Sequence, residues 1–291
     1  MSRALADALE KLLSAGGNTA ATGFTARQRI ELDLFLRQTG ALRLVSNGRG
    51  ARYETADSRL VRSHLDVLRP SAQVDLDPDL PQRANNIARM RDSKGHRHGH
   101  ATGYLLLKAI GENVTWTRPG CQAFDVAAAT AIAGLAAVAI TPADGWTTEQ
   151  PVWLVENQAL FDRTDWMPPG TYGSLVYYGG QLSNLFLEWT AQGPRGENII
   201  FFPDYDGVGL LNYARLVEKS VTAVEFWMMP NWKALLQKYG NNAVWQNTWP
   251  DFEAAMVRIK DRKIPLELSE LFEQMATSGL ALEHEAVWLN R

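Results

Sequence analysis

The chain has 291 residues, of which 46% are hydrophobic and 21% charged, an ordinary globular composition that argues against a disordered or fibrous protein. Its length favours two domains. The formal net charge of −3 conceals an asymmetry: residues 1–100 carry 16 Lys and Arg against 11 Asp and Glu, whereas the remaining residues carry 13 against 21. A basic first third beside an acidic remainder hints at a polyanion-binding module joined to a different domain.

Cysteine usage and hydropathy point to a reducing compartment and an aqueous environment. The single cysteine, Cys121, permits no internal disulfide and no cysteine-based zinc site. Residues 1–13 carry charges where a signal peptide needs a continuous apolar core. The longest uncharged apolar run, 126–140, has 15 residues and predicts a buried helix, because a bilayer span needs about 20. We therefore expect a soluble, cytoplasmic protein without membrane contact.

The first predicted elements are two amphipathic helices. Leucines at helical spacing from Leu5 to Leu13 predict the first helix, which Gly16-Gly17 ends. Thr25 and Gln28 form a capping-box pattern ahead of a second helix, which is expected to continue to about Gln38. The side chains of this second helix that are expected to face the core are Ile30, Leu34 and Phe35.

Two short strand-like segments, 41–45 and 52–54, follow these helices and are joined by a tight-turn signal at Asn47-Gly48. Helices followed by a basic-tipped hairpin are the layout of a winged helix. This layout predicts a DNA-binding domain over residues 1–70, with Arg49 and Arg52 on the wing. An unrelated small α+β module is the alternative.

Residues 71–105 are predicted to be a linker and a basic segment. Residues 70–82 contain three prolines and three aspartates, which is typical of a linker, and residues 83–97 hold five basic side chains against one acid. The side chains expected to contact DNA phosphates here are Arg89, Arg91, Lys94 and Arg97. The alternating His96, His98 and His100 would share one face of a strand and bind a metal, contact phosphate, or lie in a solvated loop.

Strands and helices alternate from residue 141 onward, which predicts an α/β domain with a mostly parallel, Rossmann-like sheet. The clearest strands are 152–155, 175–178 and 199–202, and the helices that follow them are 158–161, 182–191 and 208–217. A mostly helical extension is expected at 250–278. Residues 106–291 are thus assigned to one catalytic domain.

Carboxylates stand where two of these strands end. Glu156 follows the first strand, and Asp204 and Asp206 follow the third. Ligands bind at the carboxyl edge of an open parallel sheet. Carboxylate oxygens are hard ligands that suit Mg²⁺ or Mn²⁺, and such an ion would polarise a phosphoryl oxygen and orient or activate an attacking water. An isolated Asp-x-Asp-Gly is more often a capped turn, but the order of the motifs at successive strand ends favours a metal site.

The segments WLVENQALF (153–161), VYYGG (176–180) and FFPDYDGVGL (201–210) resemble the successive strands of a Toprim domain, the metal-binding α/β module of topoisomerases, primases and some nucleases. Their pattern is similar to the nuclease subunit of Wadjet-type (JetD-like) SMC plasmid-defence systems, which is related to the topoisomerase VI A subunit. The ending GLALEHEAVWL (279–289) resembles the Leu-Glu-Gln-Glu segment near the end of those subunits, with His284 in place of Gln. A winged helix ahead of a Toprim domain is also that group's domain order.

This resemblance implies a homodimer that cuts double-stranded plasmid DNA with Mg²⁺ or Mn²⁺ and is recruited by an SMC-like ATPase/kleisin complex. It implies that Glu156 and Asp204 hold the catalytic metal, while Asp206 helps to bind it or a second ion. Glu283 and Glu285 are either further acidic contributors or a solvated helix end. The alternatives are a non-catalytic DNA-binding or dimer-scaffold subunit, a Toprim RNase, and a topoisomerase-VI-A-like transesterase.

The transesterases of this group attack DNA with a winged-helix tyrosine. Tyr53 is the only tyrosine in the predicted winged helix, and its surroundings, GARYETAD, do not resemble that motif. The chain is also short for a Wadjet nuclease subunit. We therefore expect hydrolysis by a metal-bound water instead of a phosphotyrosine intermediate.

Overall fold

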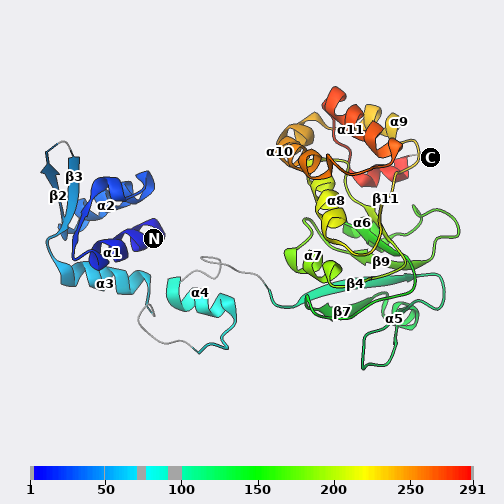
Figure 1. The fold of residues 1–291 in the computed structure, drawn as a ribbon, viewed down its shortest axis with the longest axis horizontal. Helices are drawn as coiled ribbons and strands as arrows, with labels where there is room; N and C mark the ends of the chain where they lie inside the picture. The colour runs from blue at the N-terminus through cyan, green and yellow to red at the C-terminus, as the bar shows by residue number, and fades with distance from the viewer. Residues whose placement is uncertain (1–2, 49, 71–76, 91–99, 290–291) are drawn as a thin grey trace. The chain divides into compact units, whose positions relative to one another are not determined.

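The computed structural model describes residues 3–48, 50–70, 77–90 and 100–289. The chain divides into two compact units, residues 1–100 and 101–291, which are described separately (Figure 1). The second unit begins ahead of residue 106, because strand β4 starts at Gly103. None of the described helices is long and apolar enough to cross a bilayer.

The first unit combines helices with a small antiparallel sheet of order β1-β3-β2. Its elements are α1 (Arg3–Ser14), β1 (Asn18–Ala20), the 3₁₀ turn η1 (Ala21–Gly23), α2 (Ala26–Thr39), β2 (Leu42–Asn47), β3 (Gly50–Thr55), α3 (Ser58–Leu68) and α4 (Gln82–Met90). The predicted hairpin is thus present as β2–β3, and β1 adds a third strand to it. Helix α4 occupies the first part of the segment predicted to be basic.

Helix α2 begins and ends as its sequence predicts. The Thr25 side chain accepts a hydrogen bond from the Gln28 backbone N–H, and the Gln28 side chain accepts one from the Thr25 N–H, which completes the capping box. The predicted inward face is wrong at two positions, because Ile30 is 69% and Leu34 49% exposed. Leu32 and Phe35 form the buried stripe instead, so the apolar residues of α2 lie on two faces.

The second unit is built on a six-stranded sheet of order β11-β10-β8-β9-β4-β7. Its elements are β4 (Gly103–Ile110), β5 (Thr115–Trp116), β6 (Phe124–Asp125), α5 (Val126–Ala133), β7 (Ala136–Ile140), β8 (Val152–Val155), α6 (Gln158–Asp162), β9 (Gly173–Tyr177), α7 (Asn184–Ala191), β10 (Ile199–Phe202), α8 (Gly207–Lys219), β11 (Val224–Phe226), α9 (Trp232–Tyr239), α10 (Asn242–Ile259), α11 (Leu266–Ser278) and the 3₁₀ turn η2 (His284–Leu289). Strands β11, β10, β8 and β9 are parallel, whereas β4 is antiparallel to both β9 and β7. The α/β class is confirmed, with a mixed sheet.

The apolar run 126–140 is not one buried helix, so that prediction is wrong. Helix α5 ends at Ala133, where Gly134 takes a left-handed conformation with φ of 81°. Strand β7 follows, and its side chains alternate between buried and exposed. Only Val126 of α5 is buried. The run therefore forms a helix and then a strand. Gly134 ends the helix, and after it every second side chain is buried, as in a strand.

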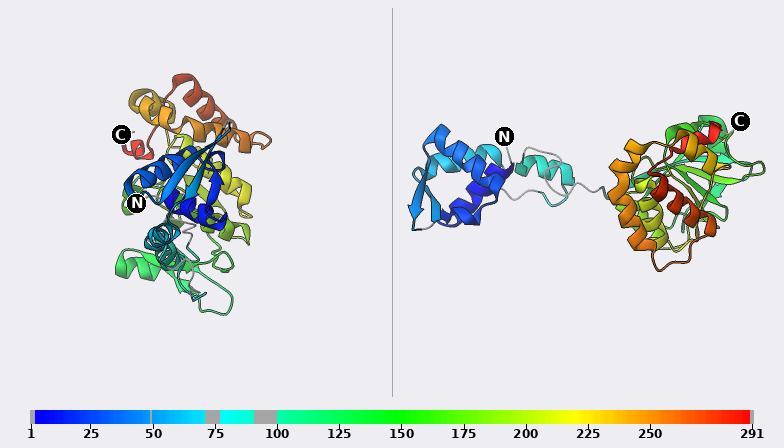
Figure 2. Two further views of the ribbon diagram at one scale, coloured as in Figure 1. Left: turned by 90° about the vertical axis from the view of Figure 1, so that its left-hand side faces the viewer. Right: turned by 90° about the horizontal axis from the view of Figure 1, so that it is seen from above.

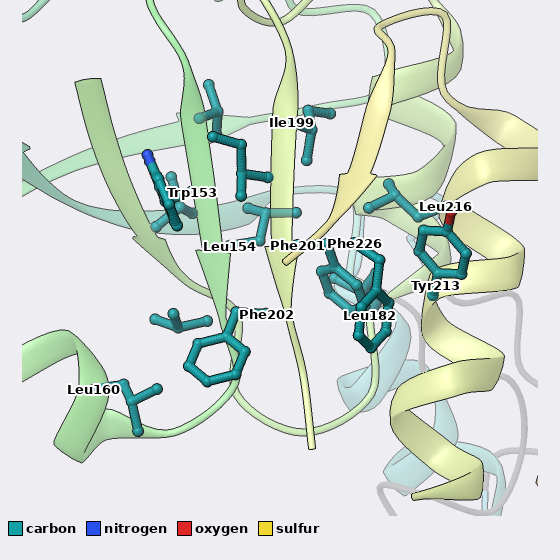
Figure 3. Close-up of a cluster of buried hydrophobic side chains, with 14 of the residues drawn as sticks. Trp153, Leu154, Leu160, Leu182, Ile199, Phe201, Phe202, Tyr213, Leu216 and Phe226 are labelled. Carbon is teal, nitrogen blue, oxygen red and sulfur yellow. The ribbon is translucent and has the colours of Figure 1, made fainter. Parts of the chain in front are cut away.

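Strand β10 lies in the centre of the parallel part of the sheet and is buried on both faces. Figure 3 shows its neighbouring side chains on opposite sides: Phe201 points toward Tyr213 of α8, and Phe202 points toward Leu160 of α6. Helices α8 and α10 lie on the same side of the strands (Figure 2). Because helices cover both faces of these strands, polar groups become accessible only where the strands end.

The turn from β10 into α8 requires glycine because other chain segments approach it closely. A Cβ on Gly207 would lie 1.8 Å from the Thr248 carbonyl oxygen of α10, and one on Gly209 would lie 2.1 Å from the Asp204 carbonyl oxygen. Neither glycine has a positive φ, so backbone conformation does not explain the requirement. The physical reason is close backbone packing instead.

Gly207→Ala should therefore destabilise the protein by about 3 kcal/mol or more, because α10 must move to make room for the methyl group. Chemical denaturation monitored by tryptophan fluorescence measures the change. Gly193→Ala is the matched control, since a Cβ there meets nothing within 4 Å and its stability should stay within about 0.5 kcal/mol of the parent. Equal stability of the two variants would contradict the packing argument.

Candidate metal centre

Three carboxylates lie at the carboxyl edge of the parallel strands, near enough for their charges to interact. Glu156 directly follows β8, and Asp204 stands two residues beyond the end of β10. These strands are parallel neighbours in which Val155 pairs with Phe202, so both end at the same edge. Asp206 is the N-cap of α8. The predicted metal ligands thus emerge from adjacent strands and from the helix that follows.

Hydrogen bonds from the surrounding chain orient each carboxylate. The Tyr178 hydroxyl donates to Glu156 Oε2 (3.1 Å), and the Gly209 N–H donates to Asp206 Oδ1 (2.7 Å). The His284 backbone N–H donates to Asp204 Oδ1 (2.8 Å). Glu156 Oε1 and Asp204 Oδ2 accept no hydrogen bond from the part of the chain that the structure describes, so each offers an oxygen to a ligand.

The carboxylates are electrostatically coupled and concentrate negative charge. The pKa of Glu156 is raised to about 8, mainly by burial and further by the charges of Asp204, Asp206 and Glu285, against the lowering effect of the Tyr178 hydrogen bond. Burial likewise raises the pKa of Asp204 and of Asp206 to about 6. Within the described ranges, no Lys or Arg forms an ion pair with Glu156, Asp204 or Asp206. The edge therefore concentrates negative charge that a cation would relieve.

The end of the chain returns to this edge. Tyr205 and Leu282 pair in antiparallel fashion through two backbone hydrogen bonds of 2.8 and 2.9 Å, which bring the residues after Leu282 beside Asp204. Of the two glutamates whose role the sequence left open, Glu285 joins the cluster and accepts a hydrogen bond from the Asn157 side chain. Glu283 is exposed, although its charge contributes to the raised pKa of Asp204.

His284 is a member of the site that sequence reasoning did not select. Its side chain is fully buried, with Nδ1 3.0 Å from Asp204 Oδ1 and Nε2 3.9 Å from Glu285 Oε2. Burial lowers the pKa of His284 to about 4, so these contacts involve a neutral imidazole near neutral pH. One ligand atom each from Asp204, His284 and Glu285 lies within 4.8 Å of the others. The available signal was a histidine between two glutamates in the ending LEHE.

A glycine loop completes the edge on the β9 side. Gly179 and Gly180 both take left-handed conformations, with φ of 60° and 71°, which side chains would strain. Asn212 of α8 is buried and holds this loop, since its Oδ1 accepts from the Leu182 N–H (3.2 Å) and its Nδ2 donates to the Gly180 carbonyl (3.4 Å). No sequence motif points to Asn212, because its hydrogen-bond partner Leu182 is 30 residues away in the chain.

Only two of the six predicted DNA-contacting side chains are described. Arg52 lies on β3 and pairs with Glu54 at 2.8 Å, while Arg89 is exposed on α4 and donates to the Asn85 side chain at 2.8 Å. The residues of these predictions that lie outside the described ranges are Arg49, Arg91, Lys94, Arg97, His96 and His98. His100 is described and exposed.

Compared with known proteins, the sequence matches no protein-family model and no curated protein. The case for a function therefore depends on the motifs and on the geometry of the site.

The raised pKa of Glu156 makes stability fall with pH. Its folded pKa of about 8 exceeds the ordinary value of 4.5, so its contribution is complete below about pH 4.5 and lost as the pH rises through 8. His284 acts oppositely, but its contribution is constant above its ordinary pKa of 6.5. Between pH 6.5 and 8 the metal-free protein should lose about 1–2 kcal/mol of stability, a value reduced by solvent screening at the open edge.

Denaturant unfolding in the presence of a chelator, at several pH values, measures this loss. Glu156→Gln should remove most of it, because the amide does not titrate. Glu273→Gln on α11, whose side chain is exposed, is the control and should behave as the parent does. A pH dependence that Glu156→Gln leaves unchanged would contradict the assignment.

Proposed function

We propose that the protein is a divalent-metal-dependent DNA endonuclease of the Toprim class, in which Glu156, Asp204 and Asp206 bind the metal. In this proposal it acts as a homodimer and as the effector subunit of an SMC-like anti-plasmid complex. The observation that carries the nuclease proposal is the group of partly buried carboxylates that no Lys or Arg of the described chain neutralises. The homodimer and the ATPase/kleisin partner rest on the motif resemblance alone.

The donor set fits a hard divalent cation. Glu156 and Asp204 each keep an oxygen without a hydrogen bond, and the remaining ligands in such sites are water and substrate phosphate. Bound Mg²⁺ or Mn²⁺ would polarise a phosphoryl oxygen and stabilise negative charge on the entering and leaving oxygens.

The protein's own residues fix the ligands before substrate binds. Tyr178 holds the Glu156 carboxylate by its hydroxyl, and its ring stacks on Phe201 at 5.6 Å, which anchors that hydroxyl to the core. The capping bond from the Gly209 N–H fixes Asp206 at the start of α8. Such support limits the reorganisation needed when charge develops in the reaction.

The first unit supports DNA binding. Its helices and the sheet order β1-β3-β2, with a hairpin of β2 and β3, are consistent with the winged-helix prediction. Helix α2 presents an outward face with Arg27, Ile30, Leu34 and Arg37, in which two cations flank two apolar side chains. Arginines can contact phosphate or guanine, and apolar side chains can contact the thymine methyl group. The exposure of Ile30 and Leu34 thus has a use in this proposal.

Hydrolysis is favoured over a covalent tyrosine intermediate because Tyr53 is poorly suited to attack. Its side chain is 2% exposed, and its hydroxyl donates to Asp33 Oδ1 at 2.7 Å. Burial and the neighbouring Asp33 raise the pKa of Tyr53 to about 12, so its nucleophilic phenolate is scarce.

Plasmid incubated with the purified protein and Mg²⁺ or Mn²⁺, alone and with its ATPase partners, should be nicked or linearised. Glu156→Gln and Asp204→Asn should each reduce cleavage by more than about 100-fold while retaining DNA binding, because the proposed DNA-contacting surface is in the other unit. Gel electrophoresis and a binding assay measure the two effects. Glu273→Gln serves as the control and should cleave as the parent does.

The same assay separates the alternatives. Binding without cleavage under every metal and partner condition would favour a scaffold subunit, and cleavage of RNA alone would favour a Toprim RNase. Tyr53→Phe should keep its cleavage activity and the parent should form no covalent DNA adduct. A covalent adduct lost in Tyr53→Phe would instead identify a transesterase.

A further inference from the structure

The proposed nuclease site uses oxygen ligands only and leaves the most enclosed polar group of this edge, His284, without a task. We propose that Asp204, His284 and Glu285 form a second cation position with one imidazole ligand, which binds Mn²⁺ or a related first-row transition ion in preference to Mg²⁺. The inference rests on the proposed function in one respect, because Asp204 is shared with the proposed catalytic metal site.

The three side chains come together through chain segments far apart in sequence. Asp204 follows β10, whereas His284 and Glu285 open η2, and the Tyr205–Leu282 backbone pair fixes one segment against the other. One ligand atom of each residue lies within 4.8 Å of the other two. This spacing is close to that of three ligands on one ion. The two carboxylates are partly open, with side-chain exposures of 26% for Asp204 and 33% for Glu285, so an ion has a route of entry.

The environment of the His284 side chain fits a metal-binding histidine better than a histidine that only packs in the core. Its ring packs against Phe202 with centroids 5.3 Å apart, as a core histidine would. However, neither ring nitrogen has a donor–acceptor geometry that makes a hydrogen bond with a described residue, although Nδ1 lies 3.0 Å from Asp204 Oδ1. The Pro203 carbonyl also faces the ring and opposes the lowering of its pKa by burial. A buried polar atom without a hydrogen bond is unfavourable, and the ring nitrogens of core histidines are normally hydrogen-bonded. Coordination of a cation by a ring nitrogen would supply the missing interaction.

The ligand set also determines which ion is preferred. Mg²⁺ takes oxygen ligands and dehydrates reluctantly, whereas imidazole suits the transition ions. A neutral imidazole has a lone pair to donate, and the two carboxylates supply the charge that balances a divalent ion. The side chain of Asn157, the N-cap of α6, donates a hydrogen bond to Glu285 and so orients its carboxylate. A site with one nitrogen and two carboxylates should therefore distinguish Mn²⁺ from Mg²⁺, whereas Glu156, Asp204 and Asp206 alone should do so weakly.

The test is electron paramagnetic resonance of Mn²⁺ bound to the full chain, in a background where the other histidines, His64, His96, His98 and His100, are all changed to Gln. His284 is then the only histidine. Electron spin-echo modulation should show a directly coordinated ¹⁴N nucleus, and labelling histidine with ¹⁵N should replace its pattern. Because the labelled sample keeps His284, this readout does not depend on how well a His284 variant folds.

His284→Gln in this background should abolish the nitrogen modulation and weaken Mn²⁺ binding by about tenfold or more, with less than about a twofold change for Mg²⁺. Glu285→Gln should weaken Mn²⁺ binding but keep the modulation. The matched control is His64→Gln in the otherwise unchanged chain. His64 is also a histidine packed on a phenylalanine, with ring centroids 4.9 Å from Phe35, and its loss should leave Mn²⁺ binding unchanged.

Bound Mn²⁺ without nitrogen modulation, or modulation that survives His284→Gln, would overturn this inference and leave the nuclease proposal intact. Coordinated nitrogen in a protein that cleaves no nucleic acid would retain the inference and reject the nuclease. Absence of any Mn²⁺ binding would reject both.

Discussion

The carboxylates at this sheet edge are held where burial and neighbouring negative charge both oppose their ionisation. Burial is the largest cause of the raised pKa of Glu156, Asp204 and Asp206. The charges of Asp204, Asp206 and Glu285 add to it at Glu156, and the charge of Asp204 adds to it at Asp206. The fold holds them together because β8 and β10 are adjacent, parallel and buried on both faces, so their ends cannot separate without disrupting the core. Since no Lys or Arg in the described part of the chain pairs with these carboxylates, a bound divalent ion would relieve the unfavourable interaction of their charges.

The connection between core and site is direct. Phe201 and Phe202 pack on opposite faces of the sheet, and each also contacts a ring that contributes to the edge. Phe201 stacks on Tyr178, which holds Glu156, and Phe202 packs on His284, which lies against Asp204. Aromatic packing thereby limits the movement of these polar groups, whereas repulsion between the negative charges favours their separation.

The sequence predicts local structure well where the signal is local. The strands 152–155 and 199–202 are short apolar runs bounded by polar residues, and their predicted ends agree with the structure. The α2 capping box is likewise contained in four residues. By contrast, the run 126–140 contains a helix and a strand of similar composition, and the outward turn of Ile30 depends on what packs against α2. Burial is a tertiary property that helical spacing alone does not determine.

The same distinction applies to the site. The order of strands and acidic residues predicts Glu156, Asp204 and Asp206, because carboxyl ends of parallel strands share an edge. It does not predict the contact of Asp204 with His284, which is 80 residues away and depends on the Tyr205–Leu282 backbone pair. Nor does it predict Asn212, whose task is to hold a loop of another segment.

The most direct test of the central claim, that this edge is a cation site, is a crystal grown with Mn²⁺ near pH 8 and measured at a wavelength where manganese scatters anomalously. An anomalous peak in contact with carboxylate oxygens of Glu156 and Asp204 is the expected result. A map with no peak at this edge, or with a Lys or Arg side chain between the carboxylates, would contradict it.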